Sequence, residues 1–281
     1  MGYSTYGQTK EIDSLQSQLA SSSSTTQRIT ILNQLANIFQ YSDDSLRLTK
    51  YLNEAITLSK REKYVNGLKY AYTTLGSIHL NKANLAEAEK NFKLSERLVT
   101  VGDEDVAIRN YNFLAELYCE QGKYVDALKL IDGALKLGKN QLSGESIVTH
   151  CIAASISQVQ SNTKKAKQHL QLAKASLKPS TSKIIRLKLY KQLFKYYRIS
   201  TNLDSLTLCA RKINELSEEL SFNFWKVGSL QAESFLNYEQ GAYGNSLNLI
   251  LRSLDIINPN LFKLYYTNLL YQAGSFYHEL D

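Results

Sequence analysis

The sequence has 281 residues, of which 43% are hydrophobic, enough for a continuous core in one large domain or two ordinary ones. Only 2 prolines and 13 glycines interrupt it, which favours long helices, and the lack of any run of 18 apolar residues excludes a membrane-spanning helix. The formal net charge is +7 at pH 7. The three cysteines are widely separated along the chain, which argues against both a disulfide framework and a zinc site.

From the N-terminus, residues 1–28 are predicted to form a helical cap or leader, and residues 29–281 a series of helical repeats. When the sequence is shifted on itself by a step of about 39–40 residues, one pattern recurs: two large residues, a small residue and another large residue. The copies are Leu32-x-x-Leu35-Ala36-x-x-Phe39, Tyr72-x-x-Leu75-Gly76-x-x-His79, Tyr111-x-x-Leu114-Ala115-x-x-Tyr118, His150-x-x-Ala153-Ala154-x-x-Ser157, Tyr190-x-x-Leu193-Phe194-x-x-Tyr197, Leu230-x-x-Glu233-Ser234-x-x-Asn237 and Leu270-x-x-Ala273-Gly274-x-x-Tyr277. Repeats are therefore predicted to start near residues 29, 69, 108, 147, 187, 227 and 267, the seventh being only begun.

A second helical pattern follows the first within the copies. In the second repeat it comprises Ala88, Phe92 and Ser95, whose spacings of four and three residues place them on one helix face. Turns are predicted between the two helices, as at Gly122 and Gly241, because glycine can adopt the positive φ that ends a helix. Each copy is therefore predicted to be a helical hairpin, with both prolines of the chain falling just after a second helix.

The order of residues in these copies resembles the tetratricopeptide repeat (TPR) family: aromatic, Leu, Gly or Ala, and Tyr, followed by Ala, Phe, Ala and a closing Pro. Residues 72–95 and 111–134 match best, and the resemblance covers about residues 29 to 281. The family unit has about 34 residues, so the longer period implies about one and a half extra helical turns per unit. The resemblance implies an all-α solenoid of about six and a half TPR-like hairpins, wound into a right-handed superhelix, whose concave groove binds a protein or peptide.

The sequence also resembles the extracytoplasmic TPR sensor regions that precede histidine kinases or cyclases in Bacteroidetes-type bacteria. Residues 8–15, a Ser/Thr-rich gap and residues 31–36 resemble the start of such a region just after signal cleavage. This resemblance implies an extracytoplasmic location, a signal peptide that is absent or removed, and a downstream kinase or cyclase module in the full-length protein. The alternative is a cytoplasmic TPR scaffold or peptide-responsive regulator.

We identify no catalytic or metal-binding set in the sequence. The four histidines are interpreted as lying in four different repeats: His79, His150, His169 and His278. None has a Cys, Asp or Glu at a spacing that closes a metal site or a nucleophile–base pair, and no glycine-rich phosphate loop occurs. The cysteines are expected to be buried as small hydrophobic residues. We therefore expect a binding protein, not an enzyme, with no cofactor and no metal.

The positive charge is confined to one part of the chain. Residues 147–202 contain eleven Lys or Arg and no Asp or Glu. The remaining 22 basic and 26 acidic residues give the rest of the chain a net charge of −4. Four cations of the block share one stripe of the predicted first helix of the fifth repeat, spaced three, four and three residues apart: Lys188, Lys191, Lys195 and Arg198.

In a TPR-like stack this stripe would face the groove. Four adjacent like charges repel one another, and an arriving anion relieves the repulsion, so the stripe predicts a site for a carboxylate, phosphate or acidic peptide. The alternative is a solvated polar face of an exposed helix. Equivalent positions on neighbouring first helices add Asn112, Gln158, Gln231, Phe235 and Tyr238 to the predicted groove.

Two of these groove residues have an alternative role, because Phe235 and Tyr238 could instead pack against the helix of the seventh repeat.

Aromatic residues interleaved with cations also suggest nucleic acid as a possible class of partner. However, Phe194 and Tyr197 belong to the packing columns, which removes most of a base-stacking surface. The predicted partner is therefore an acidic protein or peptide, and nucleic acid is disfavoured.

Overall fold

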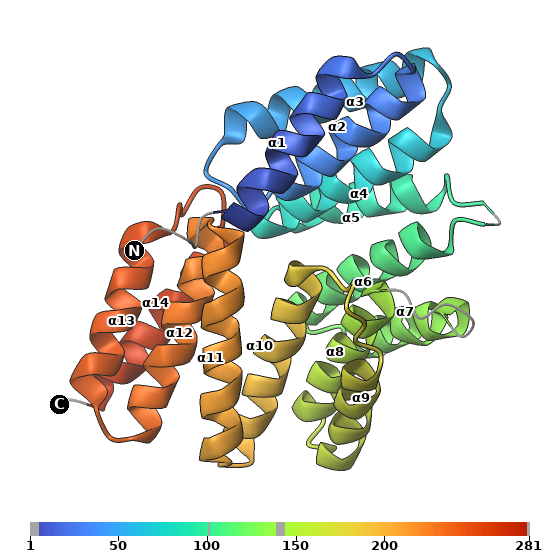
Figure 1. Ribbon diagram of the computed structural model, residues 1–281. Helices are drawn as coiled ribbons and strands as arrows, with labels where there is room; N and C mark the ends of the chain where they lie inside the picture. The colour runs from blue at the N-terminus through green and yellow to red at the C-terminus, as the bar shows by residue number, and fades with distance from the viewer. Residues whose placement is uncertain (1–5, 101, 139–143, 280–281) are drawn as a thin grey trace. The chain divides into compact units, whose positions relative to one another are not determined.

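The computed structural model describes residues 6–100, 102–138 and 144–279, and these residues form fourteen helices and no strand (Figure 1). The chain divides into two compact units, residues 1–141 and residues 142–281. The all-helical prediction is confirmed within each unit, where consecutive helices pack against one another in pairs.

Unit 1 contains three helical hairpins preceded by a single helix. Its helices are α1 (Tyr6–Ser21), α2 (Thr25–Phe39), α3 (Ser45–Arg61), α4 (Val65–Asn81), α5 (Leu85–Glu96), α6 (Glu104–Glu120) and α7 (Tyr124–Leu137). The hairpins are α2 with α3, α4 with α5, and α6 with α7, while α3 packs on α4 and α5 on α6. The helix α1 packs against α2.

Unit 2 repeats the same arrangement. Its helices are α8 (Gly144–Val159), α9 (Thr163–Ala175), α10 (Lys183–Ile199), α11 (Leu203–Leu220), α12 (Asn223–Glu239), α13 (Tyr243–Ile256) and α14 (Lys263–His278). The hairpins are α8 with α9, α10 with α11, and α12 with α13, and α14 packs on α13 as the first helix of a further repeat.

The period predicted from the sequence is confirmed. The first helices of the repeats begin at Thr25, Val65, Glu104, Gly144, Lys183, Asn223 and Lys263, so successive starts keep the predicted spacing. Each helix begins three or four residues before the start predicted from the sequence. The predicted start follows the recurring pattern of packed residues, which begins inside the helix and not at the residue that caps it. Two of these helices begin with a side-chain cap: Ser24 accepts from the N–H of Gln27, and Ser182 accepts from the N–H of Ile185.

The turn inside a hairpin recurs with the same backbone geometry. Five such turns contain a residue with positive φ, between 51° and 76°: Ala83, Gly122, Ser161, Thr201 and Gly241. In each turn the next N–H donates to a carbonyl five residues earlier, which closes the C-terminus of the first helix. The predicted turns at Gly122 and Gly241 are thus confirmed, and three repeats place a residue with a Cβ in the left-handed region instead.

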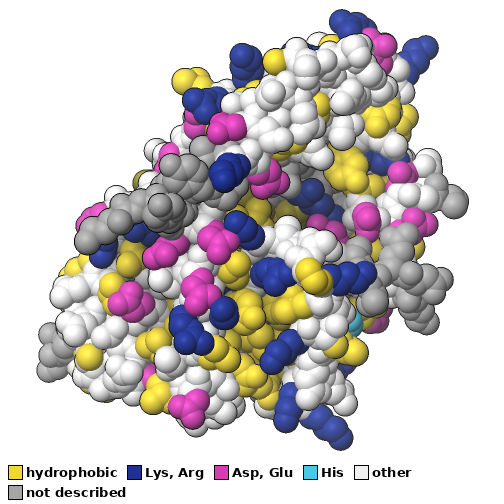
Figure 2. Space-filling model, viewed as in Figure 1, with side chains coloured by type: hydrophobic (Ala, Val, Ile, Leu, Met, Phe, Trp, Pro, Cys, Tyr) yellow, Lys and Arg dark blue, Asp and Glu magenta, His cyan; other side chains and the backbone are white. Residues whose placement is uncertain are grey.

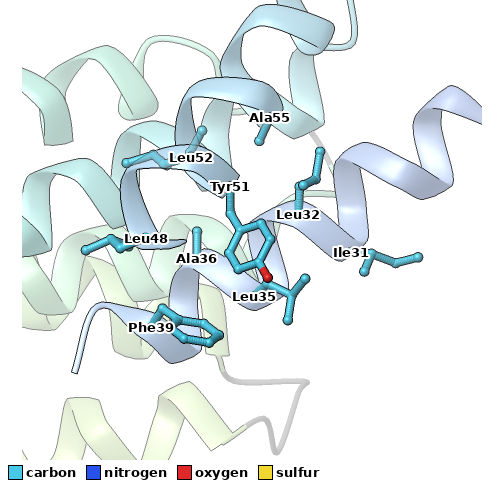
Figure 3. Close-up of a cluster of buried hydrophobic side chains, with 10 residues drawn as sticks. Ile31, Leu32, Leu35, Ala36, Phe39, Leu48, Tyr51, Leu52 and Ala55 are labelled. Atoms are coloured by element: carbon cyan, nitrogen blue, oxygen red, sulfur yellow. The ribbon is translucent and has the colours of Figure 1, made fainter. Parts of the chain in front are cut away.

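The core of each hairpin is built from apolar stripes on facing helices. Figure 3 shows this for α2 and α3, where Leu32, Leu35 and Ala36 meet Leu52 and Ala55. Ala36 and Ala55 are completely buried, and their small side chains allow the two helix axes to approach closely. Burying each leucine contributes about 1.5–3 kcal/mol, so these facing stripes hold the two helices of the hairpin together.

Candidate functional site

The first helices of unit 2 line a pocket of about 260 Å³. It is formed by one face each of α8, α10 and α12, with single residues from α11 and α14. Its lining residues are Ser155, Gln158, Val159, Lys191, Phe194, Lys195, Arg198, Ile199, Ile213, Gly228, Gln231, Ala232, Phe235 and Gln272. In Figure 2, Lys and Arg side chains border a hydrophobic surface in the region of α10. The pocket thus combines three cations with amide groups and apolar side chains, and its described lining contains no Asp or Glu.

Lys191 lines the pocket and forms a hydrogen bond with α14. Its Nζ donates to the Tyr265 hydroxyl at 3.1 Å and lies 4.9 Å from the centroid of that ring. Gly228 makes room for it, since a Cβ at that position would lie 3.4 Å from Nζ. Burial of the ammonium, and after it the positive charge of Lys188, lowers the pKa of Lys191 to about 8. At neutral pH the pocket therefore holds a cation that is poorly compensated.

A chain of hydrogen bonds fixes the groups behind Lys191. The Tyr265 hydroxyl donates to Gln231 Oε1 at 2.7 Å, and Gln231 Nε2 donates to Gln272 Oε1 at 2.9 Å. Because its hydrogen is used in this way, the Tyr265 oxygen accepts from Lys191. Burial raises the pKa of Tyr265 to about 12, with the nearby charge of Lys195 opposing the shift, so the phenol stays protonated.

Arg198 is positioned by an aromatic ring. Its guanidinium carbon lies 4.2 Å from the centroid of the Phe235 ring, which is close enough for a cation–π interaction. Burial lowers the pKa of Arg198, and the charge of Glu239 opposes that shift. The guanidinium therefore lies over the Phe235 ring, and a guanidinium has the planar set of N–H donors that suits a carboxylate.

Six of the nine predicted groove residues lie together in this pocket: Gln158, Lys191, Lys195, Arg198, Gln231 and Phe235. Lys188 lies on the same helix and affects Lys191 electrostatically, but it does not line the pocket. Tyr238 packs away from the pocket, stacking on Phe276 at 5.0 Å and donating to Glu279 at 3.2 Å. The packing alternative thus describes Tyr238, whereas Phe235 both contacts Phe276 and lines the pocket.

Asn112 is the one predicted groove residue in unit 1, where it is 2% exposed on α6. Asn112 and Lys191 lie two repeat lengths apart and so occupy equivalent positions that turn toward the helix packing. The shorter amide is enclosed at this position, and only the long lysine side chain reaches a pocket. Asn112 is buried and lines neither this pocket nor the one described in unit 1 below, so it does not fit the predicted role.

Among the residues in and behind the pocket that sequence reasoning missed, three contact Lys191 or the hydrogen-bonded groups behind it. Tyr265 and Gln272 lie on α14, and Gly228 on α12. The equivalence of first helices points to the exposed Tyr271, one repeat after Gln231, and so misses Gln272, the next residue, which forms the hydrogen bond with Gln231. Nothing in the sequence shows that another side chain lies close to Gly228, because a loosely packed glycine would look the same.

Part of the basic block serves the structure of unit 2 and not the pocket. Lys183 forms an ion pair of 2.7 Å with Glu219, which belongs to α11. Arg186 donates to three backbone carbonyls of the preceding connection, those of Lys178, Pro179 and Thr181, at 2.6–3.0 Å. These two residues therefore have partners within unit 2 and do not line the pocket.

The prediction that the four histidines lie in four different repeats is wrong. His150 on α8 and His169 on α9 belong to one hairpin, which folds back so that their Nδ1 atoms lie 3.1 Å apart. The ring centroids are 5.4 Å apart, so both nitrogens lie nearly on the line between the rings, as in a direct N–H···N hydrogen bond. Burial, and then the charge of His169, lowers the pKa of His150 to about 4.

Because of the contact between His150 and His169, we expect the chain to lose stability in mild acid. Because the pKa of His150 is lower in the folded state than its unperturbed value of about 6.5, the unfolded chain binds the proton more readily as pH falls below that value. We expect urea unfolding to show a loss of about 1–2 kcal/mol between pH 6.5 and 5. His150→Asn should reduce this dependence of the free energy of unfolding on pH, whereas His278→Asn, at an exposed position, should not. Equal dependence on pH in the wild type and both variants would contradict the prediction.

Among the described residues, no group of three or more His, Cys, Asp or Glu side chains could hold a metal ion. Cys151 and Cys209 are buried as expected, but Cys119 is only half-buried; all three are free thiols. Burial raises the pKa of the thiols of Cys119 and Cys209 to about 11, which disfavours the nucleophilic thiolate.

No helix in the described part of the chain is both long enough and apolar enough to cross a membrane. Comparison of the sequence with models of protein families and with curated proteins finds no match. The best indication of function is therefore the geometry of the unit 2 pocket.

Proposed function

We propose that this chain is a TPR-like binding module, and that the unit 2 pocket receives an acidic side chain or phosphate of a protein or peptide partner. The observation that carries the proposal is the gathering of Lys191, Lys195 and Arg198 around one pocket whose described lining contains no carboxylate. Neighbouring cations with restricted solvation gain most from an anion, because their mutual repulsion is relieved and each can donate to it.

The apolar part of the pocket supports a peptide over a free inorganic anion. Val159, Ile199 and Phe235 lie beside the cations, so a hydrophobic side chain next to an acidic one would be buried with it. Nucleic acid remains disfavoured, since Phe194 is 5% exposed and offers no ring for base stacking.

We infer a role in signal transduction from the sequence resemblance to extracytoplasmic sensor regions of histidine kinases and cyclases. In that arrangement the chain binds without catalysing, and the output lies in a downstream module of the full-length protein. The alternative is a cytoplasmic scaffold or peptide-responsive regulator that uses the same pocket. The complete coding sequence of the gene decides between them. A signal peptide encoded upstream of this chain, and a membrane span with an output module encoded downstream, would favour the sensor.

The binding proposal is tested with a fluorescent decapeptide of alternating Glu and Phe, and a matched Gln/Phe peptide, by fluorescence anisotropy. We expect Lys191→Glu/Lys195→Glu to weaken binding of the acidic peptide at least ~10-fold, about 1.4 kcal/mol, because two attractive charges become repulsive. The matched control is Lys167→Glu/Lys178→Glu, which changes the net charge equally at exposed positions of the same basic block that do not line the pocket.

Two results would contradict the proposal: unchanged affinity of the pocket variant, or an equal loss in both variants, which would indicate only long-range attraction. Thermal unfolding and Lys191→Met, which removes the charge while keeping the side-chain length, separate lost binding from lost folding. The affinity of the wild-type chain should also fall as pH rises through about 8, since Lys191 loses its proton there.

A further inference from the structure

A second pocket, in unit 1, differs in chemistry from the one described above. It has a volume of about 270 Å³ and is lined by the first helices α2, α4 and α6 of that unit. The lining residues are Thr30, Asn33, Gln34, Asn37, Tyr64, Asn66, Gly67, Tyr70, Thr74 and Arg109. These described residues include four side-chain amides, two threonines and two tyrosines, but no aliphatic side chain and no carboxylate.

The amides lie on one face because of their spacing. Thr30, Asn33, Gln34 and Asn37 follow one another at three, one and three residues, which places all four on one stripe of α2. Such a stripe would ordinarily be apolar on the inner face of a packed helix. A row of uncharged amides there offers both donors and acceptors along the pocket wall.

Asn33 is the most deeply placed of these amides, with 6% of its surface exposed. Its Nδ2 donates to the carbonyl of Gly67 at 3.0 Å, which fixes the orientation of the amide. A Cβ at Gly67 would lie 2.2 Å from Ser59 Oγ, so only glycine lets α4 come this near. Asn33 Oδ1 has no hydrogen-bond partner among the described residues, and a buried acceptor without a partner calls for a donor.

Arg109 is the only charged residue of the described lining, and it is already engaged. Its Nη2 donates to Asn37 Oδ1, and its guanidinium carbon lies 5.7 Å from the centroid of the Phe113 ring. Gln40 also donates to Asn37 Oδ1, at 2.6 Å, so that oxygen accepts from two sides. The pocket is thus a rigid polar site with one positioned cation, unlike the cluster of three in unit 2.

We infer that the unit 1 pocket binds a neutral carbohydrate. Each sugar hydroxyl both donates and accepts, as each side-chain amide does, so the two sets of groups satisfy one another. Tyr70 is 40% exposed and Tyr64 is half-buried, which leaves ring surface for the less polar face of a sugar ring. A peptide with aliphatic anchor residues is disfavoured, because the described lining has no aliphatic side chain to pack against them.

The test is an array of neutral oligosaccharides probed with the labelled 281-residue chain, followed by calorimetry with the best-retained glycan. We expect at least a tenfold loss of affinity in Gln34→Ala/Tyr70→Ala, whose side chains are exposed and whose replacement leaves the core intact. The matched control Gln18→Ala/Tyr271→Ala removes an amide and a tyrosine at exposed positions outside the pocket and should bind normally.

Three results would overturn the inference: no glycan retained, equal binding by the pocket variant, or displacement of the glycan by the uncharged hexapeptide acetyl-Gly-Ser-Gly-Ser-Gly-Ser-amide. Lys191→Glu/Lys195→Glu is included in the same titration and should bind the glycan like the wild type, because its substitutions lie in the other unit. Failure of the carbohydrate site is thereby distinguished from failure of the acidic-peptide site.

Discussion

Replacing Asp103 with alanine is expected to lower the free energy of unfolding by about 3–5 kcal/mol, because it leaves the Lys69 ammonium buried without its anion. Lys69 is 1% exposed on α4 and pairs with the Asp103 carboxylate at the start of α6, so the pair joins two adjacent repeats. Asp103 also accepts from the N–H and hydroxyl of Thr100, at 2.7 and 2.6 Å. Urea unfolding followed by circular dichroism measures the change.

The double variant Lys69→Met/Asp103→Ala provides the control. Methionine has nearly the length of lysine and no charge, so it can occupy the buried space without a partner, and the double variant should be more stable than Asp103→Ala alone. Lys69→Met alone should also cost less, since Thr100 still donates to the remaining carboxylate. If Asp103→Ala proves no less stable than the double variant, the pair does not stabilise this junction.

The same pair has a consequence in acid. The hydrogen bond from Lys69, and then that from Thr100, lowers the pKa of Asp103 to about 2, below its usual value of 3.8. A lowered folded-state pKa stabilises the protein at pH values above the unfolded one, and this contribution disappears as pH falls from about 5 toward 2. Asp103→Asn should lose this part of the acid dependence, which extends to lower pH than the effect of His150, whose folded-state pKa is about 4.

Periodicity made the fold predictable, since one pattern that recurs in every repeat constrains every hairpin at once. The left-handed turn residues show where that information ends. Gly122 and Gly241 indicate their turns directly, but Ala83, Ser161 and Thr201 have no such preference and adopt positive φ because the surrounding repeat imposes it. The division into two units likewise follows from contacts between helices, for which the repeat pattern has no marker.

The candidate sites were predictable only where charge marks them. The cations of α10 stand out because residues 147–202 lack any acid, and three of them do share a pocket. The pocket in unit 1 contains uncharged residues that occur on any helix surface, so nothing in the sequence distinguishes it. His150 and His169 both lie in the repeat predicted to start near residue 147, so their contact could have been predicted from the hairpin itself.

Filling the space beside Gly76 is expected to destabilise unit 1, even though alanine forms helices better than glycine. Gly76 lies in α4, and an added Cβ would come within 2.4 Å of the Phe92 ring on α5. Phe92 is completely buried and also stacks on Phe113 of α6, with ring centroids 5.6 Å apart, so the ring cannot easily move aside. Overpacking costs about 1–3 kcal/mol, which outweighs the gain in helix propensity of at most about 1 kcal/mol.

Phe92→Ala is expected to cost about 3–5 kcal/mol, because it removes a fully buried ring and leaves a cavity between two repeats. In Gly76→Ala/Phe92→Ala the new methyl group enters that cavity, so the double variant should be more stable than the sum of the single changes predicts, by about 0.5–3 kcal/mol. Gly274 occupies the equivalent column of α14 with no described atom within 4 Å of an added Cβ, so Gly274→Ala should stabilise the chain by about 0.5–1 kcal/mol. If Gly76→Ala stabilises to the same extent, the contact with Phe92 does not determine how closely α4 and α5 approach.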